Sequence, residues 1–406
     1  MIPALQNHQL FAACLDAYSA AGGALHNAAM YPAVAKRLDV PMAALEAKVP
    51  VGKSAQKHSL GKRSLRWMQQ NMRRAGMLER LSARGEWQLT DKAKAALTKA
   101  ESGVTLVAFS TDLGLALWTE GNEALWALDE PIHALITSPP YPIRGKGRAY
   151  GIIDESRYID FICGALEPII ARLAPGGSLA LNVGQDCYVQ GLPTRSLYRE
   201  RLVIALADRF GLHKCDDLIW HNPSKAPAPV QWASKSRVQL QHGYEPILWM
   251  TNDPKRLFSN NQRVLQPHSE KHLALIARGG EHQPRSNSDG AYQVRKGSYA
   301  NPTAGKIPRN VLRFSHTCAD QKAYKAAARK LGLPVHGAPM PVALARFLTE
   351  FLTEPGQLVV DRFGGSLTTA KACELTGRRW IAMENALEYV RGGAERFLSA
   401  PGFRFG

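Results

Sequence analysis

Short apolar runs alternate with longer amphipathic stretches from residue 104 onward. Each run is rich in β-branched or aromatic residues and ends in a cluster of polar, turn-forming residues. The stretches between the runs carry apolar residues at helical spacing. Strands that alternate with helices predict an α/β fold with a mostly parallel, Rossmann-like sheet, whose ligands bind at the carboxyl ends of the strands. The five predicted strands lie within 104–112, 127–141, 176–186, 214–223 and 243–253.

The alternation stops over residues 253–315 and then resumes. This segment is polar, rich in Gly, Asn and Ser, and without sustained periodicity, so we do not expect it to build a core of its own. Beyond it the pattern predicts a helix over 340–352, a strand over 357–363, a helix over 367–377 and a strand over 378–385.

The first hundred residues predict a small, mostly helical unit. Helices followed by a β-hairpin and a closing helix resemble a winged helix, and the longest helix carries basic residues. The alternative is a solvated helix face on a dimerisation or packing domain, which would make the chain a homodimer. The expected elements are helices over 9–20, 26–38 and within 59–80 as far as Gly76, strands Leu78–Leu81 and Glu86–Leu89, and a helix capped by Thr90 or Asp91.

Composition adds a strong basic excess to this picture. The chain has 406 residues, 45% of them hydrophobic, with 51 Lys and Arg against 34 Asp and Glu, for a net charge of +17. Residues 1–100 carry +9 of this charge and residues 253–315 carry +7, which leaves the predicted sheet nearly neutral. Such an excess favours a polyanionic partner, either nucleic acid or an anionic membrane.

Other features limit the class of protein. The composition excludes a disordered or fibrous chain. No uninterrupted apolar run long enough for a membrane span is present, and the N-terminus does not read as a signal peptide. The six cysteines are scattered without metal-ligand spacing, so we expect reduced thiols, no structural metal, no membrane partner and a cytoplasmic location.

The first candidate site follows the apolar strand His133–Ile136. Thr137-Ser138-Pro139-Pro140-Tyr141 combines a hydroxyl, a rigid loop whose carbonyl oxygens have no ladder partner, and an aromatic ring. Oxygens that accept hydrogen bonds, next to a ring that stacks, suit a planar group that bears an NH2. A Pro-Pro pair alone more often marks a turn, but the whole pentamer at a strand end is far more specific.

The second candidate site is a strand, a glycine turn, a helix and a second strand that ends in an acid. It runs from Val359 through Gly364 and Gly365 to Glu384. Glycines let a ligand approach the backbone, and an acid about 20 residues later can accept hydrogen bonds from ribose hydroxyls. The pattern therefore indicates a nucleoside site, although a Gly-Gly turn alone is usually structural. G-x-G-x-x-G is absent, which argues against a dinucleotide.

Together the two clusters resemble the S-adenosylmethionine-dependent amino-methyltransferases of DNA, which modify N4 of cytosine or N6 of adenine. TSPPY resembles the catalytic loop of that family, and DRFGGSLTTA resembles its cofactor loop, usually Asp-Pro-Phe-x-Gly-Ser-Gly-Thr-Thr. A catalytic loop that precedes the cofactor loop is similar to the circularly permuted β class, common in restriction–modification systems. Arg362 replaces the usual Pro and Leu367 replaces the last Gly.

The resemblance implies a division of the chain and a role for each motif. Residues 104–252 would form the catalytic half, 253–315 the target recognition region and 316–406 the cofactor-binding half, after the winged-helix-like unit of 1–100. The catalytic residues would be Ser138, Pro139, Pro140 and Tyr141, acting on a base flipped out of double-stranded DNA. S-adenosyl-L-methionine would contact Asp361, Phe363, Gly364, Gly365, Thr368, Thr369, Glu384 and Asp112, the last of which could instead be a helix N-cap.

DNA contacts are expected from basic residues in several parts of the chain. Those after the catalytic loop suit the phosphates of a splayed strand, and those of 253–315 would read base edges. Trp220 and Trp232 fall near the expected base pocket but are equally compatible with a core position. The expected DNA-binding residues are Arg144, Lys146, Arg148, Lys225, Lys235, Arg263, Arg278, Arg285, Arg295, Lys296, Lys62, Arg63 and Arg66.

Ser before the Pro-Pro pair is more usual in N4-cytosine enzymes of this family, so N4 of cytosine is the favoured target and N6 of adenine the alternative. The absence of a Pro-Cys dipeptide argues against C5 methylation. A competing class is a winged-helix DNA-binding regulator whose methyltransferase-like domain is inactivated by Arg362 and Leu367. Methylation of RNA or of protein glutamine is a third reading, against which Ser138 counts because such enzymes more often carry Asn there.

Overall fold

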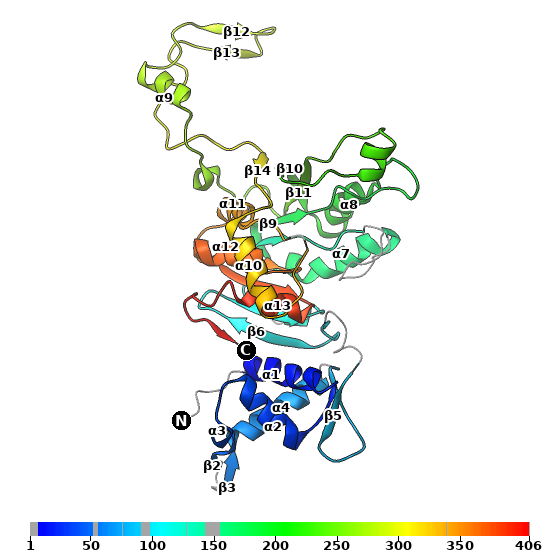
Figure 1. The fold of residues 1–406 in the computed structure, drawn as a ribbon. Coiled ribbons are helices and arrows are strands. Elements are labelled where there is room, and N and C mark those ends of the chain that lie inside the picture. The colour runs from blue at the N-terminus through cyan, green and yellow to red at the C-terminus, as the bar shows by residue number, and fades with distance from the viewer. Residues whose placement is uncertain are drawn as a thin grey trace.

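The chain is built in three parts, arranged along one direction (Figure 1). A helical unit formed by the first hundred residues lies at one end, a large sheet with its helices lies in the middle, and a thin arm projects from the other end. The computed structural model describes residues 7–51, 56–74, 76–90, 98–126, 128–142, 155–337 and 339–405. The expected helix after Thr90 and the cations Arg144, Lys146 and Arg148 lie outside these residues.

The central sheet has ten strands in the order β14-β10-β11-β9-β8-β15-β16-β7-β6-β17. Five neighbouring pairs are parallel and four are antiparallel, with β9-β8-β15-β16-β7 forming a continuous parallel centre. The predicted α/β class and mostly parallel sheet are therefore confirmed. The strands are β6 Thr105–Ser110, β7 Gly114–Thr119, β8 Ile132–Thr137, β9 Leu173–Asn182, β10 His213–His221, β11 Tyr244–Thr251, β14 Val311–Arg313, β15 Leu358–Asp361, β16 Arg379–Glu384 and β17 Arg404–Phe405.

Helices cover both faces of this sheet, and each face has its own apolar core. Side chains of α7 and α8 pack on one face and those of α11, α12 and α13 on the other. Alternate residues of a strand contribute to opposite cores, as Val359 and Val360 of β15 do. The helices are α6 Glu123–Trp126, α7 Glu155–Ile170, α8 Tyr198–Phe210, α10 Ala319–Lys330, α11 Val342–Leu352, α12 Thr368–Thr376 and α13 Leu387–Ala394.

The strand order reverses between β8 and β15, which is the topological switch point of the sheet. From β8 the chain passes through α7 to β9 on one side, and from β15 it passes through α12 to β16 on the other. Neighbouring strands whose connections leave in opposite directions form a crevice at their carboxyl ends, which is where ligands bind in open α/β sheets. Both predicted loops begin at this point, since one follows Thr137 and the other begins at Asp361.

The N-terminal unit contains the helices and the hairpin that the sequence predicts. Its three-stranded sheet has the order β1-β5-β4, and Gly76 has the positive φ of 63° that ends a helix readily. Two short strands form a separate hairpin that the periodicity does not predict. The elements are α1 Asn7–Ala20, β1 Ala24–His26, α2 Asn27–Arg37, α3 Met42–Glu46, β2 Lys48–Val51, β3 Gln56–Ser59, α4 Leu60–Arg74, β4 Leu78–Arg80 and β5 Glu86–Leu89.

Most of residues 253–315 form the projecting arm, and β14 near the end of this segment belongs to the central sheet (Figure 1). Few of its side chains are buried, which agrees with the expectation that this segment builds little core, although it does contain short elements. A two-stranded hairpin stands at its far end. The elements are η2 Asn261–Val264, α9 Glu270–Ala277, β12 Arg285–Asn287 and β13 Tyr292–Val294. No helix in the described part of the chain combines the length and the apolar character that a membrane span requires.

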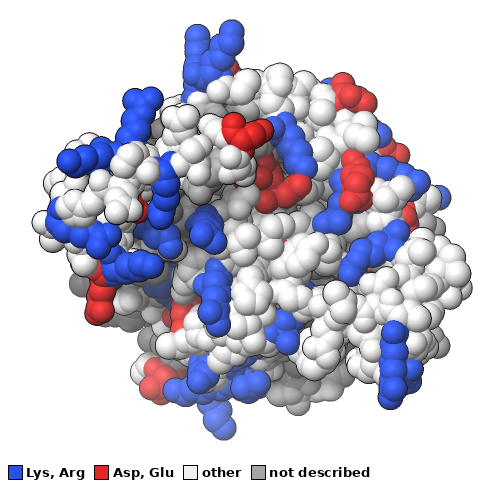
Figure 2. Space-filling view, turned by 90° about the horizontal axis from the view of Figure 1, so that it is seen from above, with Lys and Arg blue, Asp and Glu red and all other residues white. Residues whose placement is uncertain are grey.

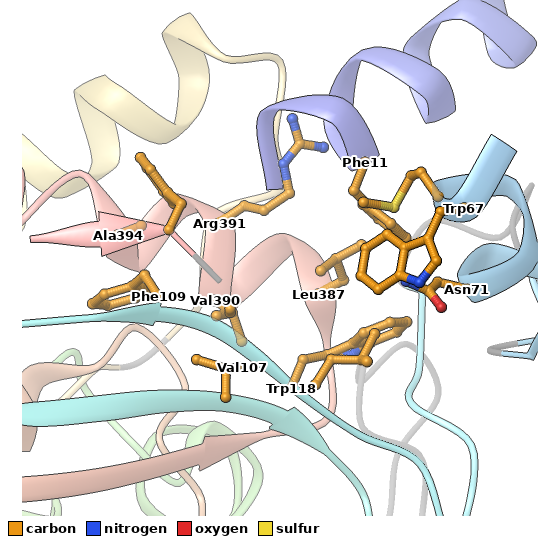
Figure 3. Close-up of a pocket in the computed structure, with 14 residues that line it drawn as sticks. Phe11, Trp67, Asn71, Val107, Phe109, Trp118, Leu387, Val390, Arg391 and Ala394 are labelled. Atoms are coloured by element: carbon orange, nitrogen blue, oxygen red, sulfur yellow. The ribbon is translucent and has the colours of Figure 1, made fainter. Parts of the chain in front are cut away.

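The N-terminal unit shares a core with the catalytic sheet. Trp118 of β7 and Leu387 of α13 are buried among the apolar side chains of α1, α2 and α4, and the rings of Phe11 and Trp118 lie 6.1 Å apart. An apolar cavity of about 240 Å³ remains at this junction, between Trp67, Val390 and the strands of the sheet (Figure 3). None of its lining residues belongs to either predicted loop.

A buried carboxylate fixes the junction. Thr98 donates to Glu388 through its backbone N–H at 2.9 Å and through its hydroxyl at 2.8 Å. The backbones of Thr98 and Ala100 also pair with those of Leu387 and Asn385. The segment that leads into β6 is therefore attached to the segment that directly follows β16.

We expect Glu388→Ala to lower the free energy of unfolding by about 2–4 kcal/mol, because both Thr98 donors would stay buried without an acceptor. Urea unfolding measures this difference. Asp129→Ala, which removes an exposed carboxylate, is the matched control and should change stability by less than about 0.5 kcal/mol. An equal effect of the two substitutions would show that the bonds to Thr98 do not hold the junction.

Candidate active site

The predicted catalytic loop leaves the carboxyl end of β8 and turns across the neighbouring strand β9. The Ser138 hydroxyl lies 3.0 Å from the Tyr141 hydroxyl and donates to the Asn182 carbonyl at 3.4 Å. Pro139 is buried, whereas Ser138 and Tyr141 are half-buried. The loop is thus fixed in the fold and still presents a hydroxyl and a ring to a ligand.

The ring of Tyr141 lies against Gly184, in the loop after β9. A Cβ at position 184 would overlap this ring, so glycine is required there. The Tyr198 hydroxyl donates to the Gly184 carbonyl and fixes the backbone under the ring. The sequence pattern did not reveal this role for Gly184, because an isolated glycine after a strand has no spacing signal.

The two predicted loops are joined directly. The Thr137 hydroxyl donates to the Asp361 carboxylate at 2.6 Å, although 224 positions separate the two residues. The backbone N–H of Phe363 lies 3.2 Å from both of these oxygens. The last residue of β8 and the last residue of β15 therefore position each other, as the parallel pairing of the two strands requires.

Burial raises the pKa of Asp361 to about 6, while the hydroxyls of Thr137 and Thr369 and the Phe363 N–H lower it in part. These hydrogen bonds favour the carboxylate form, and burial disfavours it. No Lys, Arg or His forms an ion pair with Asp361 among the residues that the structure describes. The site thus holds a negative charge without a cationic partner in the described chain.

The glycine turn after β15 forms a cradle closed by Glu384. The Gly364 N–H bonds to the Met383 carbonyl at 2.8 Å, and the Gly365 N–H donates to the Glu384 carboxylate at 2.7 Å. A Cβ on Gly365 would approach the His336 ring to 3.1 Å, so a larger residue would fill this space. Burial raises the pKa of Glu384, although its carboxylate is half-buried at the end of β16.

Arg362 attaches the cofactor loop to the segment after β7. Its Nε donates to Asn122 Oδ1 at 2.9 Å, its Nη2 donates to the Glu120 carbonyl at 2.5 Å, and its guanidinium lies over the Phe363 ring at 5.3 Å. Proline is rigid through its ring, whereas this arginine is held by hydrogen bonds. The departure from the usual Pro therefore leaves the loop well fixed.

Leu367 has the left-handed backbone conformation that explains the usual glycine at this position. Its φ is 61° and its ψ is 38°, a region that costs a residue with a Cβ about 1 kcal/mol or more. Its side chain is fully buried in the core below α12. Burial of a leucine contributes about 1.5–3 kcal/mol, which offsets the backbone strain.

The two threonines at the start of α12 are bonded within the protein. Arg396 Nη1 donates to the Thr368 hydroxyl at 2.9 Å, and the Thr369 hydroxyl donates to the Ile136 carbonyl at 3.3 Å. Both residues are buried. Thr369 thus ties α12 to β8, and Thr368 ties it to Arg396.

The expectation for Asp112 is wrong. It lies in the turn between β6 and β7, and Gly114 at the start of β7 pairs with Trp380 near the start of β16. Glu384 stands at the other end of β16, so Asp112 is at the opposite edge of the sheet from the cofactor loop. It does not cap a helix either, because a strand follows it. The polar residue that contacts Arg362 of the cofactor loop is Asn122, three residues after the end of β7 at Thr119, and the sequence reading missed it.

A cluster of ionisable groups supports the loop after β9. His242 Nδ1 is paired with Asp186, and its Nε2 lies 2.6 Å from Arg195 Nη2 and 2.9 Å from the Tyr188 hydroxyl. Burial lowers the pKa of His242, so it is neutral at pH 7 and accepts these bonds at Nε2. None of these four residues was expected from the sequence, since they come from three separate segments.

Lys225 belongs to the same cluster and is not the free cation that the sequence predicts. Its Nζ lies 2.8 Å from Glu245 and 3.9 Å from Asp186, and the side chain is only 14% exposed. Its charge is therefore neutralised inside the fold. A nearby phosphate would compete with two carboxylates for this ammonium group.

Arg263 is a second correction among the expected DNA contacts. Its guanidinium donates to the carbonyls of Glu350, Phe258 and Phe351, and it is only 18% exposed. It holds the base of the arm against the end of α11 and cannot also read base edges. Lys62 is likewise paired, with Glu46 at 2.7 Å.

The remaining expected cations are exposed. Figure 2, seen from the end that carries the arm, shows Lys and Arg spread over that face, with Asp and Glu in few places. Trp220 is in the core, where its ring N–H donates to the Phe314 carbonyl at 2.8 Å, and Trp232 is half-buried. The exposed cations are Arg63 and Arg66 on α4, Lys235 in the segment between β10 and β11, and Arg278, Arg285, Arg295 and Lys296 on the arm.

Asp361→Asn is expected to raise the free energy of unfolding at pH 8 by on the order of 2–3 kcal/mol, because it removes a buried charge and keeps the shape. A folded-state pKa above the ordinary value of 3.8 means that folding favours the protonated carboxyl. The wild type therefore loses this stability as the pH rises from about 4 through about 6, and the variant does not. Urea unfolding at pH 4.5 and pH 8 should show the larger gap at pH 8. An equal gap at both would contradict the assignment.

Comparison with known proteins agrees with this geometry. Residues 132–395 match the DNA methylase family, and residues 8–99 match the Mrr N-terminal domain. The chain is similar to the Type II methyltransferase M.PvuII of Proteus hauseri, at 33% identity over 272 residues that cover 66% of this chain and 79% of that protein. It is also similar to the DNA adenine methyltransferase YhdJ of Escherichia coli (strain K12), at 28% identity over 38% of this chain and 44% of that protein.

A solved structure supports the same assignment. The cytosine-N4-specific PvuII DNA methyltransferase superposes with a TM-score of 0.56 at 28% identity, over 74% of this chain and 91% of that one. The family match over residues 132–395 includes both loops and the strands that carry them. The expected enzyme class and its S-adenosylmethionine dependence are those of this family. The chain belongs to the DNA methylase family of N6- and N4-directed methyltransferases.

Proposed function

We propose that this enzyme transfers a methyl group from S-adenosylmethionine to N4 of cytosine in double-stranded DNA. The observation that carries the proposal is the bond between Thr137 and Asp361, which sets an amine-binding loop beside a nucleoside-binding loop. Ser138 is the residue more usual for N4-cytosine enzymes, and the relative with the matching solved structure is named cytosine-N4-specific. N6 of adenine is the competing target, as in the relative YhdJ.

The catalytic loop would act by positioning and by hydrogen bonding. The exocyclic nitrogen is a weak nucleophile, since its lone pair is delocalised into the base. The Ser138 hydroxyl and the Pro139 carbonyl would accept its two hydrogens, which favours a tetrahedral nitrogen whose lone pair points away from the ring. The ring of Tyr141 would stack on the flipped base, and Gly184, which has no Cβ, leaves room for the ring in this position.

The residues of the cofactor loop fit a nucleoside that carries a charged sulfonium. The space beside Gly365 would be filled by a Cβ, and the Glu384 carboxylate can accept hydrogen bonds from ribose hydroxyls. Asp361 holds a negative charge beside the catalytic loop, where it favours a cationic ligand. S-adenosylmethionine supplies an electrophilic methyl group at this place when bound. Phe363, Gly364 and Gly365 would hold it in position.

The arm and the N-terminal unit would bind the duplex outside the active site. The arm carries Arg278, Arg285, Arg295 and Lys296 on exposed surfaces, and a two-stranded hairpin of this kind fits the major groove. Arg63 and Arg66 on α4 form a second basic surface at the opposite end of the molecule (Figure 1). A single short duplex in the active site would therefore contact the first surface rather than both.

The chemistry is tested by incubating the enzyme with plasmid DNA and labelled S-adenosylmethionine, then digesting the DNA to nucleosides for mass spectrometry. We expect N4-methylcytosine from the wild type. Ser138→Ala should lower kcat by about 100-fold, because a positioned acceptor is lost, and should leave the cofactor Kd unchanged. N6-methyladenine as the product would correct the target base, and no transfer to any base would overturn the proposal.

The two basic surfaces can be separated by point substitutions. Deletion of residues 1–100 is unsuitable because it would expose Trp118 and Leu387. Arg295→Ala with Lys296→Ala should reduce the slope of log Kd against log salt by up to about 2 on a short duplex. Arg63→Ala with Arg66→Ala should have little effect on that duplex and a comparable effect on a long one. The same response of both pairs on the short duplex would contradict the separation.

A further inference from the structure

The segment between β10 and β11 rises from the edge of the sheet that carries the active site. His221 at the end of β10 pairs with Tyr244 at the start of β11, and β11 runs antiparallel to β9. The start of β11 therefore lies beside the end of β9, the strand next to β8. Residues 222–243 stand two strands away from Ser138 and include the short helix η1 Val230–Lys235.

This segment is held at its base. The His242 N–H donates to the Ala228 carbonyl at 2.8 Å, and Val238 N–H donates to the Trp232 carbonyl at 2.9 Å. Gln239 Nε2 donates to the Pro193 carbonyl at 2.8 Å, which ties the segment to the loop after β9. These bonds fix the backbone on both sides of position 240.

This segment exposes apolar side chains although its backbone is held in place. Leu240 is 87% exposed, more than any other large apolar residue of the described chain, and Val238 and Val230 of the same segment are 59% and 55% exposed. An exposed leucine forgoes the stabilisation that burial provides. A cluster of exposed apolar residues next to an active site indicates a surface that is covered when the substrate binds.

The same segment is connected to the ring that would stack on the target base. Tyr141 lies on Gly184, and Asp186, two residues later, is paired with His242. Leu240 is two residues before His242. Leu240 is thus connected to the catalytic loop through the pair of His242 with Asp186 and the contact of Gly184 with Tyr141. These contacts fix the position of Leu240 relative to the loop.

The charges next to Leu240 favour DNA as the partner. Lys235 and Arg237 are exposed, and neither forms an ion pair among the described residues. An exposed apolar residue close in sequence to two unpaired cations matches a duplex, which offers phosphates outside and stacked bases inside. A protein partner with an apolar surface would offer no groups for these cations to bind.

We propose that Leu240 enters the base stack of the DNA and fills the space that the flipped base leaves. The inference rests on the proposed function, since it requires a base to leave the duplex. Flipping costs the stacking and pairing energy of that base, and an apolar wedge recovers part of it. Lys235 and Arg237 would bind the phosphates on either side of the insertion.

The test compares two duplexes that carry the site modified by the wild type. In one the target base is paired, and in the other it stands opposite an abasic position, so that it flips without breaking a pair. Leu240→Ala should lower kcat/KM about tenfold on the paired duplex, in keeping with the loss of a buried leucine, and by less than about twofold on the abasic one. Leu240→Met should restore most of the activity on the paired duplex.

The matched control is Leu331→Ala, which removes an equally apolar side chain, 47% exposed, at the end of α10. It should change kcat/KM by less than about twofold on both duplexes. A thermal melt should show Leu240→Ala folded as the wild type is, because the side chain packs on little. Equal losses on the two duplexes, or no loss on either, would overturn the insertion while wild-type transfer still supports the proposed function.

Discussion

The pairing of β8 with β15 is the constraint on which the active site depends. The two strands come from opposite halves of the chain, and their parallel register sets the ends Thr137 and Asp361 side by side. Their connecting helices then leave on opposite faces, which opens the crevice between them. On the proposed function the two loops must lie together, because each would hold only one of the two reactants.

The same constraint explains why unusual residues are tolerated in the cofactor loop. The loop is fixed at its first residue by Thr137, at Arg362 by the segment after β7, and at Gly365 by Glu384. With three attachments, the backbone follows its path even though Leu367 must adopt a left-handed conformation. The buried side chain of Leu367 offsets this strain from below. A regulator with an inactive loop would not need these attachments.

The spacing of apolar residues and the positions of turn-forming residues predicted the central strands and helices well. Both signals depend only on residues close together in the sequence. The strands β8, β15 and β16 and the helices α11 and α12 fall within the predicted ranges, and β9 begins three residues before its predicted range. The sequence pattern did not predict β7. This strand begins with a glycine and follows β6 after only a short turn. That omission made Asp112 look like the polar end of the strand nearest the site, when it lies just before β7, whose carboxyl end is Thr119.

Contacts between segments that are far apart in the sequence could not be predicted from the sequence pattern. The Asp186–His242–Arg195 cluster and the bond from Thr137 to Asp361 each join residues that no periodicity relates. The loops themselves could be predicted because each is a contiguous motif. Their partners could not, because a partner is chosen by register and topology, which a single strand pattern does not specify.

Net charge gave the right class of partner and a misleading set of contacts. A count treats every Lys and Arg alike, but Lys225 and Arg263 are bound to carboxylates and helix carbonyls, where their charge stabilises the fold. The cations that can meet a phosphate are those without an acid beside them, such as Lys235 and Arg237. Since these two lie within five residues of Leu240 in the sequence, the proposed DNA surface combines unpaired charge with exposed apolar area. Neither quantity can be read from composition alone.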